Sequence, residues 1–515
     1  MRRFRLLLAG AMLLPGAGQA QSAPFRVEET SIAAVHAAFR AGTLTCRALV
    51  EAYLARIQEY DKNGPAINSL VVVNPKALEV ADSLDRRYRA SGPAGALHCI
   101  PMIVKDNFET TELPTTAGSL SLQGFVSDRD AFMVRRIKAA GAIVLAKSNM
   151  AEFAFSPYET VNSILPGYSK NPYALDRVTA GSSGGTAAAV AANLGEVGLG
   201  TDTGNSIRGP SAHQALVGIR STMGLTSRAG VVPLNLAADI AGPMARSVAD
   251  AVAVFQVVAD EDPDDPATAV SRGRPPVEYA RSLVLDGLKG ARIGVLHQAY
   301  DTPTTDPEVV AVFQAALEDL RRQGATIVDP VGVDSLDAWR RAVSGGCNQF
   351  KHDLNAWLAS HGDRVPVKTL EQVIQSRRFH PSIEKRLELS QAVEQDPDDN
   401  PGCRSRDEFR ARLRAGVLAV MDANRLDALV YPTWSNPPRL IGDLNTPHGD
   451  NNQLFSPSTG FPAITVPMGY ARGVLPAGLQ FFGRPWDEAT LIRLAYGYEQ
   501  ATRRRQPPAS TPPLR

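Results

Sequence analysis

The sequence has no excess of charge of either sign and, beyond its first residues, no long apolar run. Its 54 Lys and Arg residues nearly balance its 53 Asp and Glu residues, so the formal net charge is +1 at pH 7. A nearly neutral chain gives no reason to expect nucleic acid or an anionic membrane as a partner. No run after residue 20 reaches the roughly 18 apolar residues that a membrane span needs. We therefore expect the mature protein to be soluble.

Cysteine is scarce, with only Cys46, Cys99, Cys347 and Cys403 in 515 residues. Their wide spacing excludes a zinc knuckle. Four cysteines allow three sets of two disulfides, and the sequence does not say whether any of them forms. A chain of this length can bury enough apolar surface without such cross-links.

The first 20 residues differ from the rest of the chain. Three arginines stand among the first five residues, the apolar run Leu6–Leu14 follows, and Gly18-Gln19-Ala20 offers a small-residue cleavage site. This pattern is typical of a secretory signal peptide, and the run is too short for a permanent membrane span. We expect cleavage near Ala20 and a periplasmic or secreted protein. The pattern leaves open whether export uses the general or the twin-arginine route.

Beyond residue 30, helical and extended patterns alternate, which is typical of an α/β protein. We expect the segment at 171–177 to be a loop and the acidic segment at 260–266 to be a solvated linker. Expected helices are 31–62 (two helices), 75–91, 130–140, 186–194, 307–324, most of 335–425, and 488–502. Expected strands are 67–74, 97–105, 142–147, 196–199, 291–296, 326–328, 426–433, 460–469 and 478–483.

Two loops rich in Gly and Ser flank the expected helix at 186–194 and the strand at 196–199. The first is Gly181-Ser182-Ser183-Gly184-Gly185, and the second runs from Gly200 to Gly209. Glycine permits positive φ and close backbone approach. Such loops can direct several N–H groups at one point beside a serine hydroxyl.

Three ordinary interpretations of these loops compete. Gly and Ser are common in simple turns. A phosphate-binding P-loop is excluded because neither loop ends in Gly-Lys-Ser/Thr. The first loop fits the nucleophile-elbow pattern around Ser183, but an elbow needs a buried strand directly before it. The residues before this loop have no such pattern.

Taken together, the loops resemble the signature of the amidase signature family. The segment GSSGGTAAAVAANLGEVGLGTDTGNSIRGPSA carries two serines, Ser182 and Ser206, separated by 24 positions (206 − 182) as in that family. The family's catalytic lysine stands upstream in a Lys-Asp-Asn context, which this chain supplies as Lys105-Asp106-Asn107. Three motifs therefore agree in order and spacing, and the resemblance extends from about residue 30 to 500.

The resemblance implies amide hydrolysis by a Ser-Ser-Lys triad without metal or cofactor. Ser206 would form the acyl-enzyme, and Ser182, on a cis peptide bond, would relay protons to Lys105. The backbone N–H groups of Thr203, Gly204, Asn205 and Ser206 would form the oxyanion hole. A serine needs such a base because its hydroxyl is a weak nucleophile. We expect the protein to act on a small-molecule amide and not to bind nucleic acid. We also expect it to be a monomer or a homodimer.

The resemblance also implies the fold, a large mixed, twisted β-sheet covered by α-helices on both faces. We expect one amidase domain over 21–515, following a signal peptide at 1–20. Within it we expect a catalytic core at about 60–260, a helical cover at about 335–425, C-terminal strands and a helix at 426–502, and a loose tail at 503–515.

Some residues depart from the family pattern. Gly204-Asn205-Ser206 stands where Gly-Gly-Ser is common, Gly209 replaces a bulkier residue, and Arg220-Ser221-Thr222 stands where Lys-Pro-Thr is common. These changes affect the expected substrate rather than the triad. His213 is the histidine nearest to Ser206 in sequence, but as a base it would need a partner carboxylate.

Two other functions are compatible with the same motifs. The amidase subunit of a glutamyl-tRNA amidotransferase shares the signature, although an exported, nearly neutral chain argues against work beside tRNA. A non-catalytic binding protein on this fold is the second alternative. The intact Lys105, Ser182 and Ser206 argue against it.

Overall fold

The computed structural model describes residues 25–451 and 453–514. The expected signal peptide at 1–20 therefore lies outside the described residues. Within the described ranges, no helix combines the length and apolar character that crossing a membrane requires.

The core of the described chain is one mixed sheet of 11 strands, in the order β1-β3-β2-β6-β8-β7-β12-β13-β11-β9-β10. At one end of the sheet β1 pairs antiparallel with β3, and parallel pairs then join β3, β2 and β6. Parallel pairs also join β11, β9 and β10 at the other end, and the pairs between these two groups are antiparallel. The strands are β1 (Leu70–Val73), β2 (Pro101–Lys105), β3 (Ile143–Ser148), β6 (Val197–Asp202), β7 (Val217–Arg220), β8 (Ile240–Ala245), β9 (Arg292–Leu296), β10 (Thr326–Val331), β11 (Ala428–Pro432), β12 (Ala463–Ala471) and β13 (Leu475–Phe482).

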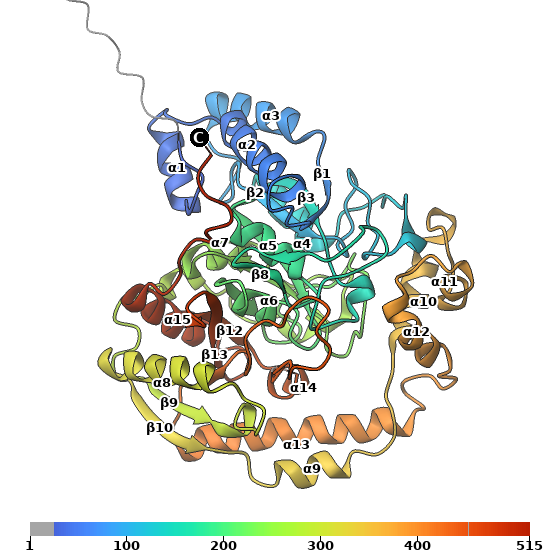
Figure 1. Cartoon of the computed structure of the whole chain (residues 1–515), viewed down its shortest axis with the longest axis vertical. Coiled ribbons are helices and arrows are strands. Elements are labelled where there is room, and N and C mark those ends of the chain that lie inside the picture. Colours follow the sequence, from blue (N-terminus) through green and yellow to red (C-terminus); the bar gives the residue numbers. More distant parts are fainter. Residues whose placement is uncertain (1–24, 452, 515) are drawn as a thin grey trace, which may run out of the picture.

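Helices surround this sheet, and the expected α/β fold with a helix-covered mixed sheet is confirmed (Figure 1). The helices are α1 (Ile32–Arg40), α2 (Cys46–Arg56), α3 (Ala77–Ser91), α4 (Phe132–Ala139), α5 (Gly184–Ala191), α6 (Arg208–Ala212), α7 (Val248–Val258), α8 (Pro307–Arg322), α9 (Leu336–Ala342), α10 (Phe350–Ser360), α11 (Leu370–Ser376), α12 (Glu384–Gln391), α13 (Pro401–Ala423), α14 (Phe455–Thr459) and α15 (Glu488–Thr502).

The central helix α5 explains why the first Gly-Ser loop is rigidly placed. All of its residues are buried, and it packs on β2, β6 and β8. A helix that is apolar all round is buried on all sides. Its small alanine side chains let the sheet approach closely, so the serines before it are held against the strand ends.

The expected loop at 171–177 is wrong in part. Lys170–Asn171 (β4) and Ala174–Val178 (β5) form a small antiparallel hairpin outside the main sheet. Because most of β5 is only partly buried, it is not the buried strand that a nucleophile elbow needs.

The acidic segment at 260–266 is not a solvated linker. Asp262 accepts a hydrogen bond from Ser227 Oγ at 2.6 Å, and Asp265 forms an ion pair with Arg228 at 2.6 Å. Both carboxylates are buried. The segment therefore holds residues 227 and 228, which follow the signature, through a hydrogen bond and an ion pair.

The C-terminal residues 503–514 pack against the N-terminal helices instead of forming a loose tail. Arg505 pairs with Glu29 at 2.7 Å, and the fully buried Arg56 donates to the carbonyls of Thr511 and Pro512 at 2.9 and 3.0 Å. The reason is that Arg56, on α2, needs acceptors inside the protein, and the tail supplies them. Figure 1 shows the C-terminus beside α1 and α2.

The structure contains two disulfides, which are one of the three sets that the sequence left open. Cys46 is bonded to Cys99, with Cα atoms 5.5 Å apart, and Cys347 is bonded to Cys403, with Cα atoms 4.6 Å apart. The second disulfide ties the start of α13 to the segment before α10. No free cysteine is present in the described residues.

Candidate active site

Lys105 ends strand β2 with its side chain fully buried. Its Nζ lies 2.7 Å from Ser182 Oγ and 2.7 Å from Thr201 Oγ1. Burial lowers the pKa of Lys105 to about 7, because the charged amine loses its hydration, while Asp239 and Asp202 act in the opposite direction. A substantial fraction of this amine is therefore neutral at physiological pH.

Ser182 stands in the loop directly before α5, and the Gly181–Ser182 peptide bond is cis. Ser182 is fully buried. A Cβ at Gly181 would lie 2.4 Å from the Ser156 carbonyl oxygen and 2.6 Å from that of Glu159. Glycine is thus required before Ser182 because neighbouring backbone fills the space.

Ser206 lies in the second loop, between β6 and α6, and lines a cavity of about 560 Å³. Thr203, Gly204 and Asn205 line the same cavity. Among the described residues, nothing accepts a hydrogen bond from the backbone N–H groups of these four residues. These four N–H groups are therefore not used in hydrogen bonds within the described residues.

The structure brings Lys105 and Ser182 into direct contact, but Ser206 Oγ forms no hydrogen bond with either within the described chain. Catalytic hydrogen bonds are often long in unliganded enzymes and shorten when substrate binds. A relay through the three residues therefore requires the contact between Ser206 and Ser182 to form in the substrate complex.

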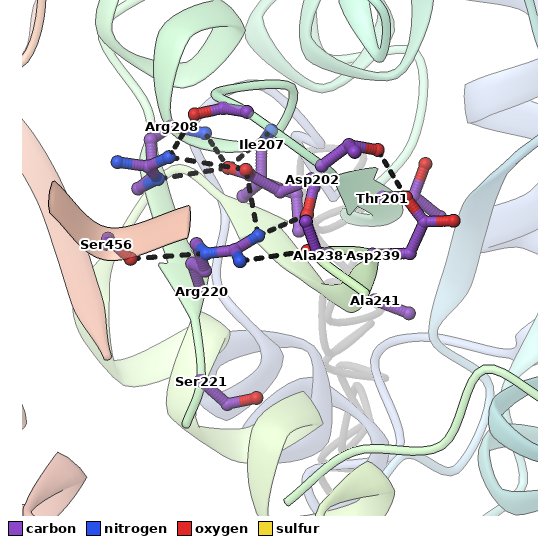
Figure 2. Close-up of polar contacts among 12 residues, drawn as sticks. Thr201, Asp202, Ile207, Arg208, Arg220, Ser221, Ala238, Asp239, Ala241 and Ser456 are labelled. Atoms are coloured by element: carbon purple, nitrogen blue, oxygen red, sulfur yellow. Dashed lines mark hydrogen bonds and ion pairs between the residues drawn. The ribbon is translucent and has the colours of Figure 1, made fainter. Parts of the chain in front are cut away.

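A buried ion cluster fixes the second loop (Figure 2). Asp202, at the end of β6, pairs with Arg208 and Arg220, each at 3.0 Å. Asp202 also accepts from the N–H of Ile207 at 3.2 Å, and Arg208 donates to the Gly204 carbonyl at 2.6 Å. The loop is therefore held from both sides of Ser206.

The charges of this cluster are strongly coupled. Burial alone would raise the pKa of Asp202, but the guanidinium groups of Arg208 and Arg220 lower it to about 2. All three side chains are fully buried. Removing the Asp202 carboxylate would leave two buried guanidinium groups without their counter-charge, and breaking a buried pair in this way typically costs about 3–5 kcal/mol. Arg220, which stands where the family commonly has lysine, is thus part of the ion cluster that holds the loop of Ser206.

The departure at Gly209 has a steric reason, whereas the described structure gives none for Asn205. A Cβ at Gly209 would lie 2.5 Å from the Trp434 ring and 3.0 Å from Asn205 Nδ2. Trp434 therefore takes the space that a larger residue would need. The Asn205 side chain is buried, and neither of its polar atoms has a partner among the described residues.

His213 and Ser183 do not join the site. The His213 ring lies 4.6 Å from that of Trp434, and its Nε2 is 3.3 Å from the Asn436 carbonyl. Burial lowers its pKa to about 3, and no described carboxylate pairs with it. Ser183 Oγ is buried and donates to the Thr201 carbonyl at 3.1 Å, so it is not presented to the cavity.

Sequence reasoning missed the residues that hold Lys105. Thr201 contacts Nζ directly, and Asn107 donates to Thr201 Oγ1 at 3.1 Å. Next to them Asp106 pairs with Lys147 at 3.4 Å, both fully buried. The sequence gave little indication of this contact, because a threonine near a strand end can have many hydrogen-bond partners. In the described residues, no group of three His, Cys, Asp or Glu side chains is placed to hold a metal ion.

The helix-covered mixed sheet and the signature loops agree with the similarity of this chain to known amidases. The family model described as Amidase matches residues 48–492. The chain therefore belongs to the amidase family and is a hydrolase of amide carbon–nitrogen bonds.

Three relatives show the range of this similarity. The chain is 33% identical to a probable amidase of Arabidopsis thaliana, over 98% of this chain and 96% of the relative. It is 35% identical to a subunit of the glutamyl-tRNA(Gln) amidotransferase of Myxococcus xanthus, over 89% of this chain and 94% of that one. The peptide amidase structure from Stenotrophomonas maltophilia has 38% identity and a TM-score of 0.83, covering 93% of this chain and 98% of that one.

Proposed function

We propose that the protein hydrolyses a linear carboxamide to a carboxylic acid and ammonia or an amine, with Ser206 as the acylated residue. The main support is the buried contact of 2.7 Å between Lys105 Nζ and Ser182 Oγ. The loop that contains Ser206 lines a cavity close to this contact. A lysine with a pKa of about 7 can accept a proton at neutral pH.

The reaction has two stages, acylation of Ser206 and hydrolysis of the resulting ester. Ser206 Oγ attacks the amide carbonyl carbon as its proton moves to Ser182, and the Ser182 proton moves to Lys105. The relay runs back to protonate the nitrogen, the C–N bond breaks, and ammonia or the amine leaves. Water gives a proton to the same relay and attacks the Ser206 ester, and the relay returns that proton to Ser206 Oγ as the C–O bond breaks and the acid leaves.

The loop at 203–206 would stabilise the tetrahedral intermediates. Its four N–H groups have no acceptor among the described residues, so they are available to the oxyanion. One preorganised donor of this kind contributes about 3 kcal/mol to lowering the barrier. The ion cluster around Asp202 keeps these donors in place before substrate arrives.

Peptide amides are the first substrates to test. The supporting observation is the similarity to a solved peptide amidase at 38% identity. A hydrolysis screen across aliphatic amides, aryl amides, anilides and C-terminal peptide amides would define the acyl group. Activity on none of these classes would contradict the proposal.

Labelling of the nucleophile tests the mechanism directly. A fluorophosphonate should add once to the protein, and peptide mapping should place the adduct on Ser206. Ser206→Ala should abolish the adduct, while Ser183→Ala, which alters the neighbouring loop, should keep it. An adduct on Ser183 would support the nucleophile elbow instead. No adduct at all would favour a non-catalytic binding protein.

Export to the periplasm or the medium is part of the same proposal, as is a monomeric or homodimeric state. Two features support export: the basic and apolar pattern of the first 20 residues, and the two disulfides of the described chain. Disulfides persist in oxidising compartments and are rare in the cytosol.

The second candidate is the amidase subunit of a glutamyl-tRNA amidotransferase, favoured by the 35% identity to such a protein. That function requires partner proteins. Purification of the native protein should separate the two candidates, since a stable heteromeric complex that contains a mature chain starting at Met1 would favour the amidotransferase.

A further inference from the structure

The cavity that contains Ser206 is also lined by several arginines. Arg340 on α9, Arg386 on α12, and Arg406 and Arg410 on α13 all line the cavity that contains Ser206. No Asp or Glu is among the described residues that line it. Helices α9 and α13 lie side by side at the lower edge of the molecule in Figure 1.

These positive charges are only partly balanced. Arg410 pairs with Asp407 at 3.0 Å and Arg340 with Asp337 at 3.8 Å, and both carboxylates are largely exposed. Within the described ranges, Arg386 and Arg406 form no ion pair with any carboxylate, and Arg386 donates only to the Phe155 carbonyl. The cavity therefore carries a net positive charge in a chain that is nearly neutral overall.

The arrangement has a cost that a purely structural role does not explain. Arg406 and Arg410 stand four residues apart on one helix, where like charges destabilise the helix. Burial, followed by repulsion from Arg410, lowers the pKa of Arg406, yet a guanidinium stays charged in proteins. The disulfide between Cys347 and Cys403 anchors α13 three residues before Arg406 (406 − 403). Two arginines are thus held in place beside the cavity.

We propose that this enzyme selects carboxamides whose acyl portion carries a carboxylate, which Arg406 and Arg386 bind. The inference rests on the proposed function at Ser206. Hydrolysis of a primary amide releases only ammonia, so whatever fills the cavity beyond the scissile bond belongs to the acyl portion. A planar guanidinium binds a carboxylate through two parallel hydrogen bonds, and the carboxylate is the anion that a peptide amide can carry.

Three matched peptide amides test the selection: acetyl-Glu-Leu-amide, acetyl-Met-Leu-amide and acetyl-Lys-Leu-amide. At low ionic strength we expect kcat/KM to be at least tenfold higher for the Glu substrate than for the Met substrate, and lowest for the Lys substrate. The preference should shrink as salt is added, because screening weakens the attraction of charges in water-filled sites.

Variants show which arginines are responsible. Arg406→Gln and Arg386→Gln should each lower the ratio of kcat/KM for Glu over Met by at least threefold. Arg406→Lys should restore part of the ratio because it keeps the charge without the planar fork. The matched control is Arg412→Gln on the same helix, whose half-exposed side chain does not line the cavity. It should leave the ratio unchanged.

The outcomes separate this inference from the one on which it rests. If the Met substrate is cleaved as well as the Glu substrate, or if Arg412→Gln changes the ratio as much as Arg406→Gln, the inference is overturned and the proposed hydrolysis stands. If no peptide amide of the three is cleaved, hydrolysis of peptide amides itself is wrong. Residual cleavage of the Met substrate by Arg406→Gln shows that this variant folds.

Discussion

Lys105 can act as a base only while its amine is neutral. A lysine in water has a pKa of about 10.4 and is almost fully protonated at neutral pH. In this protein burial lowers that pKa to about 7, and the two hydroxyls at 2.7 Å are weak compensation for lost water. The side chain is thus poised to gain and lose a proton in the working range of an enzyme.

The pH dependence of activity follows from this lowered pKa. Below about pH 7 the amine is charged and cannot accept the relayed proton, so kcat/KM should fall about tenfold for each further pH unit. Above this pH the amine is neutral and kcat/KM should level off. The measurement is a pH profile of kcat/KM with a neutral substrate, which avoids titration of the substrate itself.

Substitution of Lys105 distinguishes a base from a structural cation. Lys105→Arg keeps the charge but cannot deprotonate, so it should be nearly inactive while folded. Ser206→Ala is the matched control because it removes the nucleophile and leaves Lys105 in place. Activity of Lys105→Arg within tenfold of the original, or about 1.4 kcal/mol of barrier, would show that Lys105 is not the base.

At this scale the sequence predicted candidate site residues but not what surrounds them. Lys105, Ser182 and Ser206 are identified by motifs, because the chemistry fixes their types and spacing. The partners of Lys105 and the pairing of Asp202 with Arg208 and Arg220 depend on which strand ends meet. That information lies in the order of strands in the sheet, which one sequence does not provide.

Among the elements, several agree closely with expectation, but β7, β8, α6 and α7, which lie at the end of the signature or after it, were not expected. Helix α15 was expected at the bounds that the structure gives, and α5 and β6 within a few residues. Strands β1 and β2 are shorter than the apolar runs that predicted them. Apolar residues before a strand are also buried when they pack in a loop, as Leu97 and Ile100 do, so hydrophobicity alone does not mark where pairing begins.

The C-terminal segment was misjudged because its prolines and arginines are typical of a solvated tail. The structure instead places Arg505 between Glu29 and the carbonyls of Ala191 and Ala215. A proline-rich segment lacks backbone donors, but its carbonyl oxygens remain free to accept. Buried arginines such as Arg56 need such acceptors, and no local sequence pattern shows that Arg56 is buried and requires them.

Removal of residues 504–515 should therefore destabilise the protein. Arg56 would lose the Thr511 and Pro512 carbonyls, and Glu29 would lose Arg505. Leaving buried polar groups without partners costs about 1–3 kcal/mol each, so the unfolding midpoint should fall by several degrees. Thermal denaturation measures it, with removal of residues 514–515 as the control. An unchanged midpoint for the longer deletion would mean that the tail contributes nothing to stability.

For the whole molecule, a single sheet joins segments from residue 70 to residue 482. The serine loop, the lysine strand and the arginine-bearing helices come from distant parts of the chain. The sequence predicted this general architecture through its resemblance to a family. It did not predict how the helices at 335–425 meet the loop of Ser206, because polar helices can pack in many ways with similar burial.

Export is the prediction that concerns the chain as a whole. If the first 20 residues direct secretion, the protein folds in an oxidising compartment and both disulfides form there. N-terminal sequencing of the native protein should begin at Gln21 or within a few residues. Alkylation without reducing agent should leave all four cysteines unmodified, since each is bonded in the structure.

The control for export is a chain in which Leu7 and Leu8 are replaced by Asp, which interrupts the apolar run that a signal peptide needs. This variant should stay in the cytosol, keep Met1 or begin at Arg2, and react with alkylating agent at its cysteines because thiols stay reduced there. Since Cys347 and Cys403 anchor the helix that carries Arg406, the cytosolic form should also unfold at lower temperature than the exported one. An original chain that starts at Met1 in the cytosol with four free thiols would refute export and revive the intracellular amidotransferase function.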